Sequence, residues 1–109
     1  MTLPLSEADV QRVVTDAAEL LGWTWCHFRP SMTRHGWRTP VQGPLGQGWP
    51  DLFMVRDRDR RVLLVECKGP NGRLSPEQHA VHDRLRSAGL DVRIVRPVDI
   101  DHFIERCLR

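Results

Sequence analysis

Two acidic residues and a lysine stand at the same end of a predicted β-hairpin, where they could bind a metal ion and a phosphate. Asp51 comes just before the short apolar run 52–55, and Glu66 and Lys68 follow a second run, 62–65, beyond a polar turn. Antiparallel strands place the start of the first strand beside the end of the second, so Asp51 is expected near the other two residues. Residues two apart on a strand share a face, so Glu66 and Lys68 point the same way.

These charged groups have two explanations. Strand-end charges often form a structural ion pair, here between Lys68 and either carboxylate. Alternatively, two neighbouring carboxylates offer the hard oxygen ligands that Mg²⁺ prefers, together with water and phosphate oxygens. In that case Lys68 would polarise or deprotonate an attacking water and offset the charge of a phosphoryl group. The residue types alone leave both explanations open.

Hydrophobic spacing predicts a helix over residues 6–21, N-terminal to the hairpin. Ser6 is a good N-cap, with Asp9 in the position of a capping box, and Gly22 stands where a helix ends. Its apolar residues follow helical spacing: Val10, Val13, Val14, Ala17, Ala18 and Leu21. Glu7 lies on this apolar stripe and not on the solvent face. A simple explanation is that an acidic residue at the N-terminus of a helix is stabilised by the helix dipole.

Residues 23–29 are expected to form a strand that ends at His27 and Arg29. These two side chains either contact nucleic-acid phosphate, hold the carboxylates, or are simply solvated. Residues 30–49 form a long irregular segment, rich in glycine and proline, that we expect to be mobile without substrate. It carries Arg34 and Arg38 together with tryptophans, side chains suited to phosphate contact and base stacking.

A second helix is predicted after the hairpin. Ser75 is its N-cap, Pro76 its first residue and Gln78 the partner in a capping box. Gln78 also shares a helix face with Val81 and Leu85, so it points inward at the end near Lys68. Its amide therefore either only caps the helix or also supports a site.

Gly89 ends this helix, residues 90–96 form a strand, and Asp99 is expected to cap a last helix. The element order is then α-β-β-β-α-β-α, with one hairpin and one helical crossover. This order predicts an α/β fold with a mixed central sheet flanked by helices.

Composition is that of an ordinary globular chain. The 109 residues fit one domain, residues 1–109, with 40% hydrophobic and 28% charged residues. The net charge of +2 is too small to indicate nucleic-acid binding, although all but one of the 16 basic residues are arginine, which suits bidentate phosphate contacts. No signal peptide and no membrane-length apolar run is evident, so no membrane partner is expected.

Cysteine and histidine give weaker signals. Cys26, Cys67 and Cys107 form neither a disulfide framework nor a zinc pattern, and they fit a reducing cytosol. His79 and His82 stand at helical i, i+3 spacing, but a transition-metal site there needs further ligands, and none is evident in the sequence.

The residues of the hairpin resemble a known signature. Pro50-Asp51, a spacer of 14 residues and then Glu66-Cys67-Lys68 are similar to the PD-(D/E)XK nuclease motif, with Cys67 at the variable position. The glycine-rich segment 43–48 and the segment 72–78 resemble the VRR-NUC branch of that superfamily, in its stand-alone phage or bacterial type. The resemblance spans nearly the whole chain and implies a restriction-endonuclease-like core.

The resemblance also implies an activity, the hydrolysis of DNA phosphodiesters with Mg²⁺ or Mn²⁺ and without an organic cofactor. In its terms Asp51, Glu66 and the Cys67 backbone carbonyl bind the metal, Glu7 is the third carboxylate, Lys68 activates water and Gln78 supports the site. The candidate DNA contacts are His27, Arg29, Arg34, Arg38 and Arg73.

The substrate that the resemblance implies is branched DNA such as a four-way junction, cut by a homodimer in the cytoplasm of a bacterial or phage-infected cell. A linear-duplex or flap nuclease, an RNA nuclease of the same fold and a catalytically silent DNA-binding module remain alternatives. Sequence preference is left open, because nothing in the chain reads bases explicitly.

Overall fold

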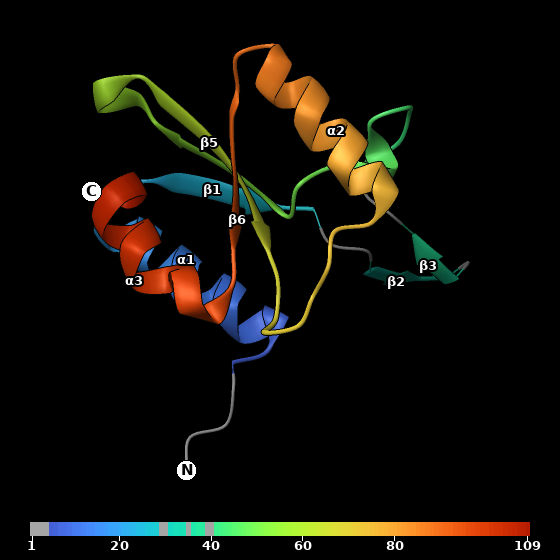
Figure 1. Ribbon diagram of the computed structural model, residues 1–109, viewed down its shortest axis with the longest axis horizontal. Coiled ribbons are helices and arrows are strands. Elements are labelled where there is room, and N and C mark those ends of the chain that lie inside the picture. The colour runs from blue at the N-terminus through green and yellow to red at the C-terminus, as the bar shows by residue number, and fades with distance from the viewer. Residues whose placement is uncertain (1–4, 29–30, 35, 39–40) are drawn as a thin grey trace.

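The computed structural model describes residues 5–28, 31–34, 36–38 and 41–109, which form a four-stranded sheet, a separate hairpin and helices (Figure 1). In chain order the elements are α1 (Glu7–Leu20), β1 (Thr24–His27), β2 (Ser31–Thr33), β3 (Gly36–Arg38), β4 (Leu52–Arg56), β5 (Arg61–Cys67), α2 (Pro76–Ser87), β6 (Asp91–Val95) and α3 (Ile100–Phe103). A π-helical turn, Ile104–Leu108, extends α3.

The main sheet has the strand order β1-β4-β5-β6. Strand β4 runs antiparallel to both β1 and β5, whereas β5 and β6 are parallel and are joined through α2. The predicted α/β fold, with a mixed sheet flanked by helices, is therefore confirmed. The hairpin of β2 and β3 is an addition to it.

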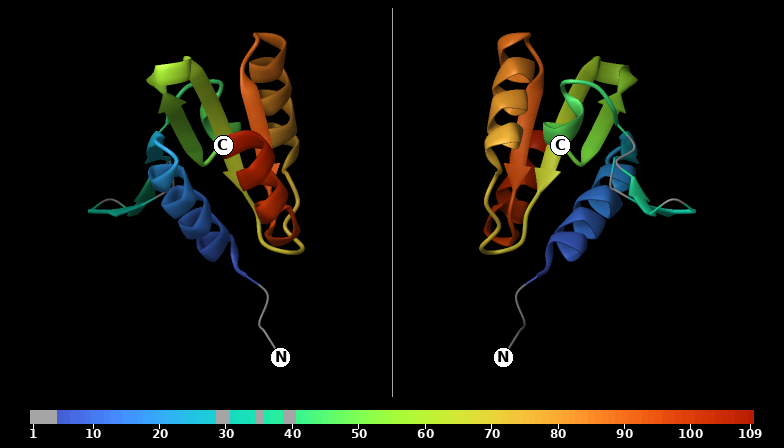
Figure 2. Two further views of the ribbon diagram at one scale, coloured as in Figure 1. Left: turned by 90° about the vertical axis from the view of Figure 1, so that its left-hand side faces the viewer. Right: turned by 90° about the vertical axis from the view of Figure 1, so that its right-hand side faces the viewer.

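Helices cover both faces of the sheet (Figure 2). Successive side chains of a strand point to opposite faces, and β5 follows this rule. Leu63 and Val65 pack in one apolar cluster with residues of α1 and α3, whereas Leu64 packs with Val81 of α2 in a second cluster. Glu66 is two residues after Leu64, so its side chain faces α2.

Both predicted capping boxes are present. The Asp9 N–H donates to the Ser6 hydroxyl (3.2 Å), and the Ser6 N–H donates to the Asp9 carboxylate (3.1 Å). The Gln78 N–H donates to the Ser75 hydroxyl (3.1 Å), and the Ser75 N–H donates to the Gln78 amide oxygen (2.9 Å). Helices α1 and α2 therefore begin where the sequence predicts, which places Gln78 in the first turn of α2.

The prediction of an irregular segment over residues 30–49 is wrong in part, whereas residues 41–45 form neither helix nor strand, as expected. Strands β2 and β3 pair there, and Gly46–Gly48 form a 3-10 turn against α2. A Cβ on Gly48 would lie 2.3 Å from the Glu77 carbonyl oxygen, so this close approach requires glycine. Three-residue strands are too short to show a period of two, which is why the pattern did not indicate them.

Asp99 is the N-cap residue of α3, as predicted, but its side chain makes no cap hydrogen bond to that helix. A 3-10 turn, Pro97–Asp99, precedes α3, and within it the Arg96 N–H donates to the Asp99 carboxylate (2.9 Å). Because Pro97 fixes φ near helical values, the chain begins to coil at Pro97, three residues before the predicted start of the helix at Ile100. In the described part of the chain, no helix has the length and apolar character needed to cross a membrane.

A buried arginine joins the turn end of the β4–β5 hairpin to the end of the chain. The Arg56 guanidinium donates to the carbonyl oxygens of Leu108 (2.8 Å) and Leu21 (3.0 Å) and to both Asp59 carboxylate oxygens (3.0 and 2.9 Å). It lies 4.8 Å from the centre of the Trp23 ring, whose indole N–H also donates to Leu108 (2.9 Å). A charge that is only 4% exposed needs these partners.

The substitution Asp59→Asn should lower the melting temperature at neutral pH, and the difference from wild type should vanish in acid. Hydrogen bonds from Arg56 hold the pKa of the Asp59 carboxyl below its ordinary value of 3.8. Such a carboxyl contributes stability above its unfolded-state pKa and loses that contribution as the pH falls through its folded-state pKa. Thermal unfolding from neutral pH to below 3.8 checks this. Asp57→Asn, in the same turn, is the control, and a gap that is constant with pH would contradict the prediction.

Candidate active site

Three carboxylates from three separate elements meet at one end of the β4–β5 hairpin. Glu7 is the first residue of α1, Asp51 directly precedes β4, and Glu66 is the penultimate residue of β5. Each offers an oxygen, and these three oxygens lie within 4.8 Å of one another. Glu66 is only 1% exposed, while Glu7 and Asp51 are half-buried.

The register of the hairpin positions Asp51. Because Leu52, the first residue of β4, pairs with Val65, the residue before it, Asp51, lies opposite Glu66. The Cys67 N–H donates to the Asp51 carboxylate (2.9 Å), which orients this side chain along the end of β5. The prediction that the hairpin brings Asp51 beside Glu66 therefore agrees with the geometry.

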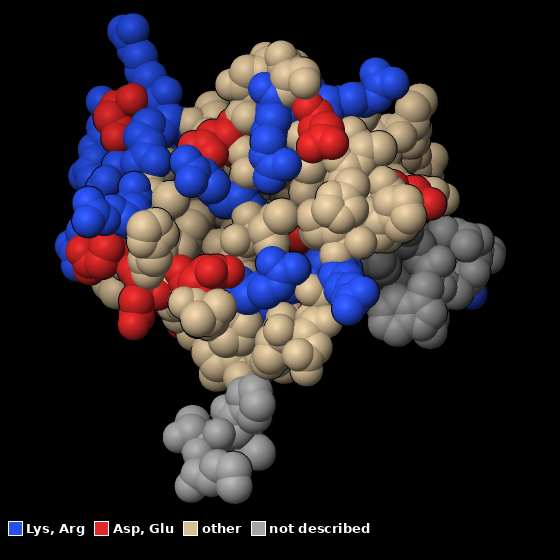
Figure 3. Space-filling view, in the orientation of Figure 1, with Lys and Arg blue, Asp and Glu red and all other residues tan. Residues whose placement is uncertain are grey.

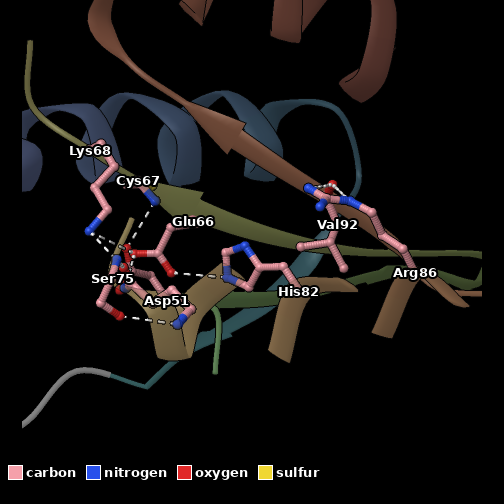
Figure 4. Close-up of polar contacts among 9 residues, drawn as sticks. Asp51, Glu66, Cys67, Lys68, Ser75, His82, Arg86 and Val92 are labelled. Atoms are coloured by element: carbon pink, nitrogen blue, oxygen red, sulfur yellow. Dashed lines mark hydrogen bonds and ion pairs between the residues drawn. The ribbon is translucent and has the colours of Figure 1, made fainter. Parts of the chain in front are cut away.

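Polar side chains surround the Glu66 carboxylate on the α2 side of the sheet (Figure 4). The Gln78 amide nitrogen donates to Oε2 (3.3 Å), and the Lys68 ammonium lies 3.8 Å from the same oxygen. On the other side, Nε2 of His82 lies 3.7 Å from Oε1. Helix α2 therefore supplies two of these groups, Gln78 and His82.

Gln78 caps α2 and also contacts Lys68 and Glu66. Its amide oxygen accepts from the Ser75 N–H (2.9 Å), which completes the capping box, and also from the Lys68 ammonium (3.2 Å). Its amide nitrogen is the donor to Glu66. One side chain thus links the start of α2 to the lysine and the carboxylate of the hairpin.

His82 is a residue of this site that the sequence did not single out in this role. The sequence paired it with His79, but His79 is exposed whereas His82 is completely buried. Burial lowers the pKa of the His82 imidazole below its ordinary value of 6.5, and the charge of Arg86 acts in the same direction. Its spacing of four residues from Gln78 was the available signal, because both side chains then share a helix face.

The donor set suits a hard divalent cation. Carboxylate oxygens are the ligands that Mg²⁺ and Mn²⁺ prefer, and three carboxylates so close together repel one another unless a cation is bound. Lys68 adds one positive charge beside Glu66. The acidic cluster of Glu7, Asp51 and Glu66 could therefore bind a divalent metal ion.

The predicted DNA contacts lie at different places. His27 ends β1 opposite Leu52, so it lies at the Asp51 end of the hairpin, where its exposed ring stacks on Trp25 with centroids 6.1 Å apart. Arg34, in the β2–β3 turn, and Arg73, between β5 and α2, are exposed, Arg38 belongs to β3, and Arg29 lies outside the described residues. Their roles in DNA contact stay predictions.

Many of the remaining arginines are remote from the carboxylates. Lys and Arg side chains gather on the side of the molecule that carries the β4–β5 turn and the C-terminal helix (Figure 3). Arg56 pairs with Arg61 at that end of the hairpin, about 17 Å along the strand from Asp51 at roughly 3.4 Å per residue. Arg61 also lies 4.9 Å from the Trp23 ring. These arginines stabilise the fold at the end opposite the carboxylates.

Comparison with known proteins identifies related domains. The model of the family described as "VRR-NUC domain" matches residues 31–99. A solved structure described as "VRR_NUC domain" is similar with a TM-score of 0.68 and 25% sequence identity, over 94% of this chain and 99% of that chain. The structural likeness thus extends over almost the whole chain.

Two curated relatives are both named Fanconi-associated nuclease 1. The protein from Ailuropoda melanoleuca is 42% identical over 53 residues, and that from Danio rerio is 45% identical over 47 residues. These matches cover 49% and 43% of this chain but only 5% of each relative. The chain therefore corresponds to a small part of those larger proteins.

Neutralising one carboxylate tests the electrostatic crowding of the cluster. Asp51→Asn retains an oxygen that can accept from the Cys67 N–H, but it removes one of three neighbouring negative charges. In EDTA the variant should be more stable than wild type, by about 1 kcal/mol, the scale of one charge interaction in a partly solvated site. Mn²⁺ should raise the melting temperature of wild type more than that of the variant.

Differential scanning fluorimetry in EDTA and in Mn²⁺ measures both effects. Asp57→Asn, at the opposite end of the same hairpin, should respond to Mn²⁺ as wild type does. Equal stabilisation of Asp51→Asn and wild type by Mn²⁺ would contradict a metal site at this cluster.

Proposed function

We propose, since this chain belongs to the VRR-NUC domain family, that it is a metal-dependent endonuclease hydrolysing DNA phosphodiester bonds. This family is part of the PD-(D/E)XK-like nuclease superfamily. The observation that carries the proposal is the meeting of Glu7, Asp51 and Glu66 within 4.8 Å, with Lys68 3.8 Å from Glu66. Carboxylates around a potential cation site, with a lysine at its edge, are suited to phosphoryl chemistry.

In this proposal Asp51, Glu66 and Glu7 hold Mg²⁺ or Mn²⁺, and the Cys67 backbone carbonyl is a further ligand. Asp51 is oriented by its hydrogen bond from the Cys67 N–H, and Glu66 by its hydrogen bond from the Gln78 amide. These bonds hold the two carboxylates in place before a metal binds, which reduces the rearrangement that binding requires.

Lys68 would orient the attacking water and offset the charge of the phosphoryl group. Its side chain is 12% exposed, and its ammonium is held by the Gln78 amide oxygen at 3.2 Å. In such a partly desolvated position a positive charge interacts with a phosphate more strongly than it would in bulk water. When bound, the metal ion would supply Lewis acidity and stabilise the leaving oxygen.

The preferred substrate is proposed to be branched DNA, cut in the manner of a Holliday-junction resolvase by a homodimer. A four-way junction has two-fold symmetry, whereas the described part of each chain carries one such cluster, so paired cuts call for two copies. Leu20 on α1 and Val98 beside α3 are exposed apolar side chains, 87% and 86% respectively, and they are candidate positions for contact between copies. The alternatives are a linear-duplex or flap nuclease with the same site, or a silent DNA-binding module.

The deciding experiment compares cleavage of a labelled four-way junction and its matched linear duplex in Mg²⁺, Mn²⁺ or EDTA. Wild type should cut the junction with paired nicks, and EDTA should abolish cutting. Asp51→Ala should lower the rate by at least about a hundredfold, the scale of a group needed in the transition state, yet leave junction binding in place. Sedimentation of the protein–junction complex should show two copies.

Asp57→Ala is the matched control, because it removes an exposed carboxylate at the other end of the same hairpin. Cutting of both DNAs would support the nuclease activity but contradict the preference for junctions. A monomer bound to the junction would contradict the proposal that a homodimer makes the paired cuts. Binding without cutting under any metal would favour the silent module, and preferential cutting of a matched RNA hairpin would favour an RNA nuclease.

A further inference from the structure

A cavity of about 470 Å³ opens directly beside the carboxylate cluster. Its lining includes Phe28, Gln47, Trp49 and Glu77, together with Asp51 and Gln78 of the candidate active site. Because Asp51 and Gln78 belong to both, the cavity and the carboxylate cluster are continuous. Its volume is within the range of sites that bind small organic groups.

The walls of the cavity include two aromatic rings. Phe28 and Trp49 meet edge to face, with ring centroids 5.9 Å apart and planes at 87°. Both residues are half-buried and line the cavity. An accessible aromatic face is a stacking surface for a nucleobase, and stacking of this kind tolerates any base.

Away from a metal bound at Asp51, the charge of the lining disfavours a phosphate as the occupant. Among the described lining residues the charged ones are Asp51 and Glu77, which are both acidic. An anionic group would be repelled there, whereas an uncharged planar ring would not. The Glu77 carboxylate can accept from an exocyclic amine of a base, and the Gln47 amide can both donate and accept.

The wall that carries Gln47 and Trp49 is held firmly against α2. Gly48, between them, lies so close to the Glu77 carbonyl oxygen that a Cβ would meet it at 2.3 Å. Trp49 also packs against the apolar cluster that contains Leu64 and Val81. The cavity is therefore bounded by packed structure on this side.

We propose that this cavity binds an unpaired nucleobase next to the phosphate that is cut. The inference rests on the proposed nuclease function, and it narrows the substrate to DNA with an unpaired base at the cleavage position, as at a fork or other branch. In an intact duplex every base is stacked and paired, so a base would first have to leave the stack to enter. Because an unpaired base enters the cavity more readily than a paired one, the cavity would favour branched DNA over a continuous duplex. Stacking would not make this preference depend on which base is bound.

The test uses the full chain and a forked duplex that carries the fluorescent base 2-aminopurine at one of the unpaired positions beside the branch. A matched fully paired duplex serves as the second substrate. Binding is followed by fluorescence in Ca²⁺, and cleavage of both DNAs is then measured in Mn²⁺. Wild type should change the fluorescence at one fork position and should cut the fork faster than the duplex.

Trp49→Leu and, if that variant does not fold, Gln47→Ala should lose the fluorescence change and weaken the preference for the fork about tenfold, while duplex cutting persists. Trp25→Leu removes an aromatic side chain of β1 that does not line the cavity, and it should behave as wild type. An unchanged fork preference in both cavity variants would overturn this inference alone. A wild type that cuts neither DNA in Mn²⁺ would overturn the proposed nuclease function itself.

A second inference concerns His82 and rests on a different observation. His82 and Gln78 are one helical turn apart on α2, and the Gln78 amide donates to Glu66. Figure 4 shows the His82 ring beside the Glu66 carboxylate. The His82 side chain is completely buried, and neither of its ring nitrogens has a hydrogen-bond partner within the described residues. A buried imidazole without a partner is destabilising, so its location calls for an explanation.

We infer that His82 is a positioning residue that donates its Nε2–H to Glu66 Oε1 while Gln78 holds Oε2. The present separation of 3.7 Å becomes a hydrogen bond after a shift of less than about 1 Å. With both oxygens held from α2, the Glu66 carboxylate is fixed in orientation toward Asp51 and Glu7. This inference rests on the proposed metal site, because it assigns the contact a role in metal binding.

Calorimetric titration of the full chain with Mn²⁺, without DNA, tests this role independently of cleavage. His82→Leu retains much of the buried volume but lacks the donor, so Mn²⁺ binding should weaken about tenfold. His82→Gln keeps a donor and should recover part of the loss, while His79→Leu, on the exposed part of the same helix, should bind as wild type does.

The melting temperature of each variant in EDTA separates a packing defect from a metal-binding defect. Unchanged Mn²⁺ affinity in His82→Leu, together with normal binding by wild type, would overturn the role of His82 alone. Should His82→Leu fail to fold, His82→Met, which also lacks the donor, replaces it: weaker Mn²⁺ binding by His82→Met than by His82→Gln would support the inference, and equal binding by the two variants would oppose it. Absence of Mn²⁺ binding by wild type would overturn the metal site itself.

Discussion

The register between β4 and β5 is the constraint on which the rest of the site depends. Pairing of Leu52 with Val65 places Asp51 opposite Glu66, and a slip of one residue would turn Glu66 away from α2. The same register brings the Cys67 N–H to the Asp51 carboxylate. Mutual repulsion of carboxylates is thus built into the strand pairing, and a cation would relieve it.

The two ends of this hairpin have opposite character. At one end acidic groups converge beside a single lysine, whereas at the other Arg56 holds the C-terminal carbonyl of Leu108 and packs over Trp23. Arg56 stabilises the fold at the end of the hairpin far from the carboxylates. Its charge can be buried because its guanidinium donates hydrogen bonds to both Asp59 carboxylate oxygens. The candidate active site and the contacts that join Arg56 to the C-terminal segment therefore lie at opposite ends of the β4–β5 hairpin.

Much of the fold and part of the site follow from local patterns. The meeting of Asp51 with Glu66 could be predicted because a hairpin with a short turn fixes its own register, and the start of α2 because Ser75 and Gln78 form a local box. The location of His82 beside Glu66 could not, because it depends on how α2 packs across β5. Likewise, the sequence alone did not show that Arg56 and Arg61 lie at the turn end of the hairpin, away from the carboxylates, because this depends on the pairing of β4 with β5.

The shared role of Gln78 joins the local unfolding of α2 to the order of the site. If the first turn of α2 frays, the Ser75 N–H, the Lys68 ammonium and the Glu66 carboxylate each lose a hydrogen-bond partner at the same time. Helix fraying usually requires little free energy, but here it would also dissolve the polar network around the carboxylate. Any ligand that stabilises this network therefore also makes the first turn of α2 more rigid. How often that turn frays then reports how well the side chains of the candidate site are ordered.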